Sequence, residues 1–278
     1  MKKISRRSFM AAAAVSVAAL ALTACGGSAS SVASSVASSA SSAAASTSAA
    51  AGELTTVMAG KLTMATNATF PPYEMTTDSG DIEGIDVDTA KAIAEKLGLE
   101  LQVDDMEFDA ALLSVQQGKA DIAMAGITVT DERKAVMAFS DSYATGIQSI
   151  IVPEGSDIAS PDDLAGKKIG TQRGTTGYIY CSDDFGDDAV VAYDDGLTAV
   201  QALNNGQVDA VVIDNAPAKE FVAANPGLVI LDTSYAEEDY AIGLAKGSAL
   251  EDAVNAALEE LKADGTLQSI VDKYITAE

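Results

Sequence analysis

The sequence contains no histidine, and only two of its 278 residues are cysteines, Cys25 and Cys181. Thiolate and imidazole groups are the usual ligands of structural zinc and the usual partners in a cysteine–histidine nucleophile pair. The composition therefore excludes both kinds of site, and we expect no metal and no cofactor. Since Cys25 lies in an N-terminal motif that resembles a lipidation site, described below, Cys181 is left alone, and we also expect no intramolecular disulfide.

Basic residues are few as well. The chain has 17 lysines and arginines against 41 aspartates and glutamates, which gives a net charge of −24. Four of the basic residues and none of the acids lie in residues 1–24, so a chain without that segment has 13 against 41, or −28. Such a charge repels phosphates, so we expect neither nucleic acid nor an anionic lipid surface as a partner.

The first 24 residues have the composition of an export signal. Lysines and arginines at positions 2, 3, 6 and 7 precede an apolar run, 9–22, that is too short for a membrane span. The run ends in LTAC at 22–25, which resembles the lipobox of bacterial lipoproteins and implies a lipid on Cys25. The alternative is an ordinary signal peptide followed by a chance cysteine. Residues 5–9 (SRRSF) also resemble a twin-arginine signal, and a plain basic region fits equally well.

Residues 28–51 contain only serine, alanine, valine and threonine. Such a stretch cannot bury enough apolar surface to become ordered, so we interpret 25–53 as a lipidated cysteine followed by a flexible tether. This arrangement implies a folded part anchored at the extracytoplasmic face of a bacterial cell membrane.

After the tether, predicted strands alternate with predicted amphipathic helices, for example a strand at 62–66 and a helix at 86–97. Alternating units of this kind predict an α/β fold with mostly parallel sheets flanked by helices. Two similar segments, QGKAD at 117–121 and NGQVD at 205–209, suggest two related halves. We expect lobe 1 at 54–146 plus 240–278 and lobe 2 at 147–239, joined by two chain crossings that form a hinge.

The segment 125–133 (AGITVTDER) carries the most informative chemistry. Arg133 offers the bidentate fork that matches a carboxylate, and the Thr128 hydroxyl can donate to a carboxylate or accept from an ammonium. Thr130 is a good N-cap for a helix that follows an apolar strand, which places these groups where α/β sheets bind ligands. The alternative is a capped helix with a surface arginine.

Eight further stretches, in order along residues 54–274, resemble the extracellular solute-binding proteins of family 3, the polar amino-acid-binding proteins of ABC transporters. They are 66–74 (TNATFPPYE), 84–88 (GIDVD), 108–112 (FDAAL), 118–121 (GKAD), 139–143 (FSDSY), 163–167 (DLAGK), 174–177 (GTTG) and 209–214 (DAVVID). The resemblance implies a two-lobe, type II periplasmic-binding-protein fold. It also implies capture of a free L-amino acid between the lobes and delivery to a membrane permease and its ATPase.

The resemblance also assigns roles to residues. Phe70 and Phe108 resemble the two aromatic walls of the site, although both could be core residues. The Gly126 carbonyl and the Asp214 carboxylate would accept from the ligand ammonium; Asp214 could instead cap a helix. Arg133 and the Thr176 backbone N–H would bind the ligand carboxylate, and Thr128 would contact both the carboxylate and the ammonium.

The ligand side chain is less defined. Asn67 stands where family members that bind cationic ligands often have an acid, which weakens the case for arginine or lysine. Gln172 and Tyr143 are expected at the rim of the site. Two other functions remain open, a ligand-sensing module and a dehydratase of the same fold. No nucleophile–base pair is recognisable, so we expect a binding protein rather than an enzyme, acting as a monomer.

Overall fold

The structure is a computed structural model that describes residues 54–275. The predicted signal peptide (1–24), the predicted lipidation site Cys25 and the predicted tether lie outside the described residues. Among the residues described, none of the helices is both long enough and apolar enough to cross a bilayer.

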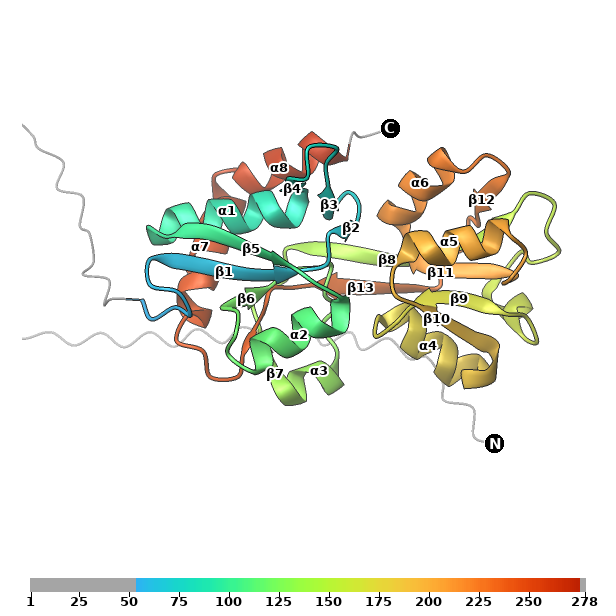
Figure 1. Cartoon of the computed structure of the whole chain (residues 1–278), viewed down its shortest axis with the longest axis horizontal. Helices are drawn as coiled ribbons and strands as arrows, with labels where there is room; N and C mark the ends of the chain where they lie inside the picture. The colour runs from blue at the N-terminus through green and yellow to red at the C-terminus, as the bar shows by residue number, and fades with distance from the viewer. Residues whose placement is uncertain (1–53, 276–278) are drawn as a thin grey trace, which may run out of the picture. The chain divides into compact units, whose positions relative to one another are not determined.

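The first sheet has five strands in the order β5 (Glu100–Asp105), β1 (Lys61–Thr66), β6 (Ile122–Ala123), β14 (Gly243–Ala245) and β7 (Met137–Phe139). The helices that pack around it are α1 (Ile85–Leu97), α2 (Phe108–Gln116), α3 (Asp131–Val136), α7 (Glu251–Ala263) and α8 (Thr266–Tyr274). In Figure 1, α1 and α8 lie above these strands and α2 and α3 lie below them. We call this sheet with its helices the first lobe.

The second sheet has the order β10 (Val190–Tyr193), β9 (Ile169–Gln172), β11 (Ala210–Asp214), β8 (Ala144–Pro153) and β12 (Leu228–Ile230), and β13 (Ala236–Tyr240) also pairs with β8. Its helices are α4 (Thr176–Phe185), α5 (Gly196–Asn204) and α6 (Asn215–Ala224), with short 3-10 turns at Pro161–Leu164 and Asp187–Ala189. Figure 1 shows α5 and α6 on one side of the strands and α4 on the other. We call this sheet with its helices the second lobe.

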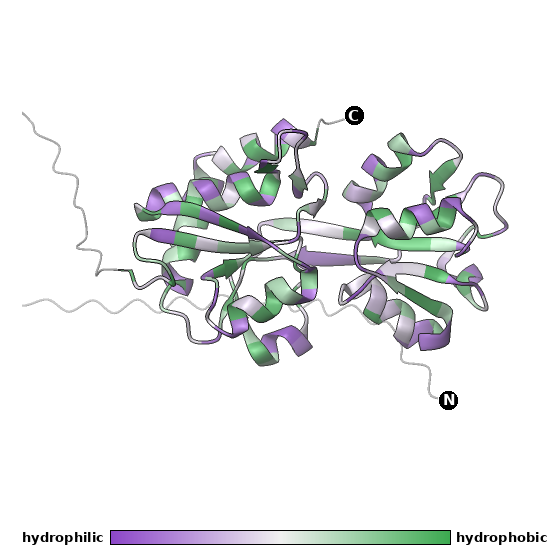
Figure 2. Cartoon of the chain, in the orientation of Figure 1, coloured by the Kyte–Doolittle hydropathy of each residue, from purple (hydrophilic) through white to green (hydrophobic). Residues whose placement is uncertain are grey.

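Two antiparallel strands join the lobes. β8 leads the chain into the second sheet and β13 leads it back, and the two pair from Gln148 opposite Ala236 to Ala144 opposite Tyr240. Figure 2 shows β13 as a hydrophilic strand in the middle of the molecule, in keeping with its sequence AEEDY. The predicted lobe limits, 146/147 and 239/240, fall inside these strands and stay a prediction.

The α/β two-lobe fold is confirmed, but each sheet is mixed rather than mostly parallel. Only β5–β1–β6 and β10–β9–β11 are parallel. The remaining pairs are antiparallel because β8, β13 and β14 adjoin the crossings and meet the sheets from the opposite direction.

Local sequence explains the elements that position the site. α1 buries the apolar face Val87, Ala90, Ile93 and Ala94, and it ends at Gly98, whose φ of +71° suits glycine. A small three-stranded sheet, β2 (Thr69–Phe70), β3 (Glu74–Thr76) and β4 (Ile82–Glu83), leads into that helix. The predicted helix at 86–97 is therefore confirmed, and β2–β4 bring the segment after β1 to the cleft.

Candidate ligand-binding site

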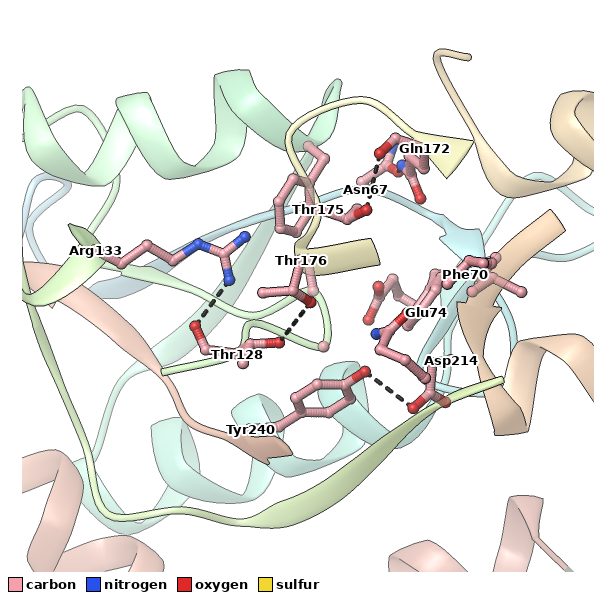
Figure 3. A pocket seen from close by; sticks show the side chains of 16 residues that line it. Asn67, Phe70, Glu74, Thr128, Arg133, Gln172, Thr175, Thr176, Asp214 and Tyr240 are labelled. Atoms are coloured by element: carbon pink, nitrogen blue, oxygen red, sulfur yellow. Dashed lines mark hydrogen bonds between the residues drawn. The ribbon is translucent and has the colours of Figure 1, made fainter. Parts of the chain in front are cut away.

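One cavity is lined by side chains of both lobes. The lobes are closed over it, since Arg133 of the first lobe donates to Gly174 of the second lobe and Gln172 of the second lobe donates to Asn67 of the first. Its lining comprises Asn67, Phe70, Glu74, Phe108, Ala125, Gly126, Thr128, Arg133, Gln148, Gln172, Thr175, Thr176, Val212, Ile213, Asp214 and Tyr240. All nine residues predicted for the site are among these, so the structure brings them together in one place (Figure 3).

Arg133 is buried and held from two sides. Its Nη1 donates to the Thr128 carbonyl oxygen at 2.8 Å and its Nη2 to the Gly174 carbonyl oxygen at 3.1 Å. The guanidinium carbon lies 5.4 Å from the centre of the Phe108 ring, within cation–π range. Burial lowers the pKa of Arg133. The side chain is thus fixed in place with N–H groups to spare, as a carboxylate clamp requires.

The local fold places Arg133 as the sequence predicts. Thr130 is the N-cap of α3, and its Oγ1 accepts from the Arg133 N–H at 3.2 Å. This bond fixes the first turn of α3 and sends the arginine side chain toward the cavity. The prediction of a capped helix is confirmed, and the arginine is buried rather than on the surface.

Thr128 and Thr176 approach each other from opposite lobes. Their hydroxyl oxygens lie 3.3 Å apart, and each lies 3.0 Å from Oε2 of Glu238 on β13. Gln148 Nε2 donates to the same oxygen at 2.9 Å. Because bonds to a charged acceptor are the stronger ones, both hydroxyl protons point at Glu238. A single buried carboxylate on the hinge strand thus orients a side chain from each lobe.

Asp214 ends β11 and caps α6. Its Oδ1 accepts from the Ala216 N–H at 2.9 Å, and its Oδ2 accepts from the Ile147 N–H at 2.8 Å and the Tyr240 hydroxyl at 3.0 Å. Burial raises the pKa of Asp214 to about 6, although these donors act in the opposite direction. The two interpretations of Asp214, cap and cavity acid, are therefore compatible, because a carboxylate has several acceptor positions.

Asn67 and Gln172 connect the lobes at another edge of the cavity. Gln172 Nε2 donates to Asn67 Oδ1 at 2.8 Å, and Asn67 Nδ2 donates to the Met106 carbonyl oxygen at 3.0 Å. The Thr69 hydroxyl also donates to Asn67 Oδ1, at 2.9 Å. The Asn67 amide is thus engaged in protein contacts on both its oxygen and its nitrogen.

The aromatic side chains pack tightly around Gly126. Phe70 stacks on Tyr73 with ring centres 5.8 Å apart, and Tyr73 meets Tyr240 edge-on at 5.5 Å. Gly126 has a φ of +54°, and a Cβ there would lie 2.8 Å from Phe70 Cε1 and 3.2 Å from Tyr240 Cε2. Glycine is therefore required both for the backbone conformation and for the close approach of the two rings.

Glu74, Glu238 and Tyr240 are among the site residues that sequence reasoning missed, as is Gln148, which donates to Glu238. Glu74 lies in the cavity wall with no solvent exposure, and neither of its carboxylate oxygens has a hydrogen-bond partner in the part of the chain that the structure describes. A glutamate inside the apolar, proline-stiffened segment 66–74 was a usable signal, because unpaired acids are seldom fully buried without a role. Tyr143, expected at the rim, is buried behind the cavity wall and donates to Asp86 Oδ2 at 2.8 Å.

Figure 3 draws Arg133 on one side of the cavity and Glu74 and Asp214 on the other. The site thus has a cationic end and an acidic end, separated by hydroxyl and aromatic groups. Among residues 54–275, no group of histidine, cysteine, aspartate or glutamate side chains has the arrangement of a metal site. The arrangement suits a zwitterion with a polar or charged side chain.

Comparisons with known proteins agree with this geometry. A probable histidine-binding protein of Neisseria gonorrhoeae is 32% identical over 96% of this chain and 95% of its own. The arginine-, lysine-, histidine-binding protein ArtJ of Geobacillus stearothermophilus has a TM-score of 0.75 at 35% identity, covering 78% of this chain and 96% of its own. An ancestral arginine-binding protein bound to glutamine has a TM-score of 0.75 at 42% identity, covering 79% and 100%. The model of the bacterial extracellular solute-binding proteins, family 3, matches residues 62–277, and the chain belongs to that family.

Proposed function

We propose that this solute-binding protein captures a free amino acid with a cationic side chain and delivers it to the permease and ATPase of an ABC importer. The observation that carries the proposal is that one cavity has a cationic group at one side and a carboxylate at the other. The fixed Arg133 guanidinium stands at one side, and the Asp214 carboxylate stands at the other. The first complements an α-carboxylate and the second an α-ammonium.

Glu74 supports a cationic side chain. It is buried, it lines the cavity, and its oxygens have no donor among residues 54–275, so a guanidinium or ammonium group would satisfy them. The engaged amide of Asn67 carries no charge, and the acid expected at that position is supplied by Glu74 instead. ArtJ and the Neisseria relative, which their names describe as binding arginine, lysine or histidine, support the same ligand class.

Closure of the lobes provides the mechanism. Arg133 reaches Gly174, and Gln172 reaches Asn67. Glu238 also accepts hydrogen bonds from a hydroxyl of each lobe. These interlobe hydrogen bonds close the edges of the cavity, so entry of an amino acid requires an open form. Ligand contacts from both lobes then shift the population back toward closure.

We further propose that the mature chain is a monomer that acts without catalysis and is held at the outer face of the cell membrane by a lipid on Cys25. The LTAC motif at 22–25 and the low-complexity segment 28–51 support this anchor. Labelling of growing cells with a fatty acid tests it. The wild-type chain should carry label and fractionate with membranes, whereas Cys25→Ala should carry none.

A thermal-shift screen of residues 25–278 with Cys25→Ser, freed of carried-over ligand by unfolding and refolding, tests amino-acid capture. The panel contains the twenty L-amino acids, ornithine, cystine and agmatine, which is arginine without its carboxylate. A ligand at 100 times its Kd adds about 2.7 kcal/mol, or roughly 5–11 °C for a chain of this size. We expect shifts with arginine, lysine or histidine and none with agmatine. No shift with any amino acid would contradict the proposal.

A further inference from the structure

We propose that Asp86 is the second carboxylate of the side-chain site, and that Glu74 and Asp86 together hold one proton, which a cationic ligand replaces on binding. This inference rests on the proposed function. It concerns a residue outside the cavity lining, and it predicts a measurable exchange that amino-acid capture alone does not require.

Backbone contacts bring the two carboxylates together. The Asp86 N–H, at the start of α1, donates to the Tyr73 carbonyl oxygen at 2.9 Å, immediately before Glu74. Gly84 allows this contact: a Cβ there would overlap the Tyr73 carbonyl and lie 2.9 Å from Glu74 Cα. The first turn of α1 is therefore pressed against β3, with both acids fully buried.

The hydrogen bonds of the two acids are unequal. Asp86 Oδ2 accepts from the Tyr143 hydroxyl at 2.8 Å and from the Gly126 N–H at 3.1 Å. Asp86 Oδ1 and both oxygens of Glu74 have no donor among the described residues. Donors stabilise the charged form of a carboxylate, so Asp86 is the anion of the pair. Glu74 carries the proton, which it can donate to the free oxygen of Asp86.

The groups around the pair provide no compensating cation. Asp105 faces it from the end of β5, Tyr73 and Tyr143 are phenols, and Asp214 of the second lobe acts on Tyr73. Arg133 is bound to the carbonyl oxygens of Thr128 and Gly174.

The remaining charged groups lie at the surface beside α1. There Lys273 of α8 pairs with Asp88 at 2.7 Å, next to the Tyr274 hydroxyl, and the Lys273 side chain is 55% exposed. None of the ion pairs among residues 54–275 includes Glu74 or Asp86.

Two buried carboxylates without a cation cannot both remain charged. Burial, and then the charge of Asp86, raise the pKa of Glu74 well above its usual value. Burial raises the pKa of Asp86 to about 6, while its donors and Glu74 lower it. Since the two groups interact, their protons belong to the pair rather than to either residue.

The exchange conserves charge. Before binding, protonated Glu74 and ionised Asp86 carry one negative charge. When a guanidinium or ammonium enters, the Glu74 proton leaves to solvent, and two carboxylates plus one cation again carry a net charge of minus one. A neutral side chain of the same shape leaves the proton in place, because the Glu74 hydroxyl can donate to its carbonyl oxygen.

Calorimetric titration at about pH 7, in buffers of different ionisation enthalpy, counts the protons released. The probes are L-arginine and L-citrulline, which has the shape of arginine without its charge. We expect about one proton released per arginine and none per citrulline. Above about pH 7, where Asp214 with its pKa of about 6 is ionised, arginine affinity should rise up to about tenfold per pH unit while the pair is protonated, and citrulline affinity should stay level.

Two variants test whether the released proton comes from the Glu74–Asp86 pair. Glu74→Gln should abolish proton release and weaken arginine at least tenfold while citrulline changes little. Asp86→Asn can keep the Tyr143 and Gly126 bonds through its amide oxygen and turn its amide nitrogen toward Glu74. It should therefore still bind arginine but release almost no proton.

The outcomes separate the two proposals. Arginine binding without proton release in the wild-type chain, in all buffers, overturns this inference and leaves the proposed function standing. Binding of citrulline but of neither arginine nor lysine overturns both this inference and the cationic ligand class of the proposed function. Failure to bind any amino acid overturns the proposed function instead. Since these results come from the wild-type chain, they hold even if a variant does not fold.

Discussion

Gly174 of the second lobe lies against Asp109 of the first lobe so closely that a Cβ at position 174 would overlap the Asp109 carboxylate. Gly174 also accepts the interlobe hydrogen bond from Arg133. A side chain at this position would therefore have to displace the exposed Asp109 carboxylate when the two lobes close.

Gly174→Ala should weaken ligand binding by about two- to tenfold, because the Asp109 carboxylate must move aside in the closed form. Calorimetry gives the affinity, and small-angle scattering shows whether ligand still makes the protein more compact. Gly186→Ala is the matched control. Its φ of +87° gives the same backbone strain, but nothing lies within 4 Å of its Cβ. Equal effects of the two substitutions on affinity would show that strain, not closure, is responsible.

Arg133→Lys should weaken amino-acid binding by about 100-fold, although the charge is retained. A lysine cannot donate to the Thr128 and Gly174 carbonyl oxygens and also present a fork to a carboxylate, and losing a buried charged partner costs about 2–5 kcal/mol. Arg173→Lys controls for the loss of an exposed arginine, since Arg173 is 57% exposed in its contact with Asp194. An affinity within a few-fold of wild type for Arg133→Lys would remove Arg133 from the site.

Glu238→Gln should destabilise the closed form and weaken binding by about tenfold. The amide is a poorer acceptor for the Thr128 and Thr176 hydroxyls, and hydrogen bonds to charged groups contribute about 1.5–3 kcal/mol. Glu237→Gln removes the same charge from the neighbouring, exposed position of β13. Calorimetry on both variants separates the effect of position from that of net charge. Indistinguishable affinities would contradict a hinge role for Glu238.

The ligand-free protein should become less stable as the pH rises from about 4 to about 6, because of Asp214. Its folded-state pKa is about 6 against an ordinary 3.8, so in this window the folded state binds more protons than the unfolded state. The free energy of unfolding therefore falls as the pH rises, by about 1–3 kcal/mol for this group.

Asp214→Asn tests this sign, since asparagine can still cap α6. Urea unfolding across that pH range should show that the free energy of unfolding falls less with rising pH in the variant than in the wild type. Asp232→Asn, at an exposed position, should follow the wild type. If the free energy of unfolding falls as steeply with pH in the variant as in the wild type, Asp214 is not the group that titrates.

The sequence predicted which residues line the cavity better than it predicted the hinge strand and the strand directions that hold them in place. Motifs such as AGITVTDER at 125–133 place functional groups near strand ends, where α/β folds bind ligands, and Arg133, Thr128 and Asp214 do meet there. The capping role of Thr130 follows from local chemistry alone, and for that reason it could be predicted. Contacts of these residues with a ligand remain predictions.

Glu238 and β13 could not be recognised in the same way. The sequence AEEDY has no apolar alternation to mark a strand, and adjacent acids usually indicate a solvated surface. Only the pairing with β8 shows that Glu238 and Tyr240 point inward while Glu237 and Asp239 are exposed. The mixed sheets were missed for a related reason, since strand direction depends on the crossings and not on the pattern within a strand.

The position of L-arginine in a crystal structure of its complex with residues 25–278, carrying Cys25→Ser, tests the central claim most directly. We predict that the α-carboxylate lies on Arg133 and the Thr176 N–H, the α-ammonium on Asp214, and the guanidinium on Glu74. An arginine bound in the reverse direction, with its guanidinium away from Glu74, or bound outside this cavity would contradict the account.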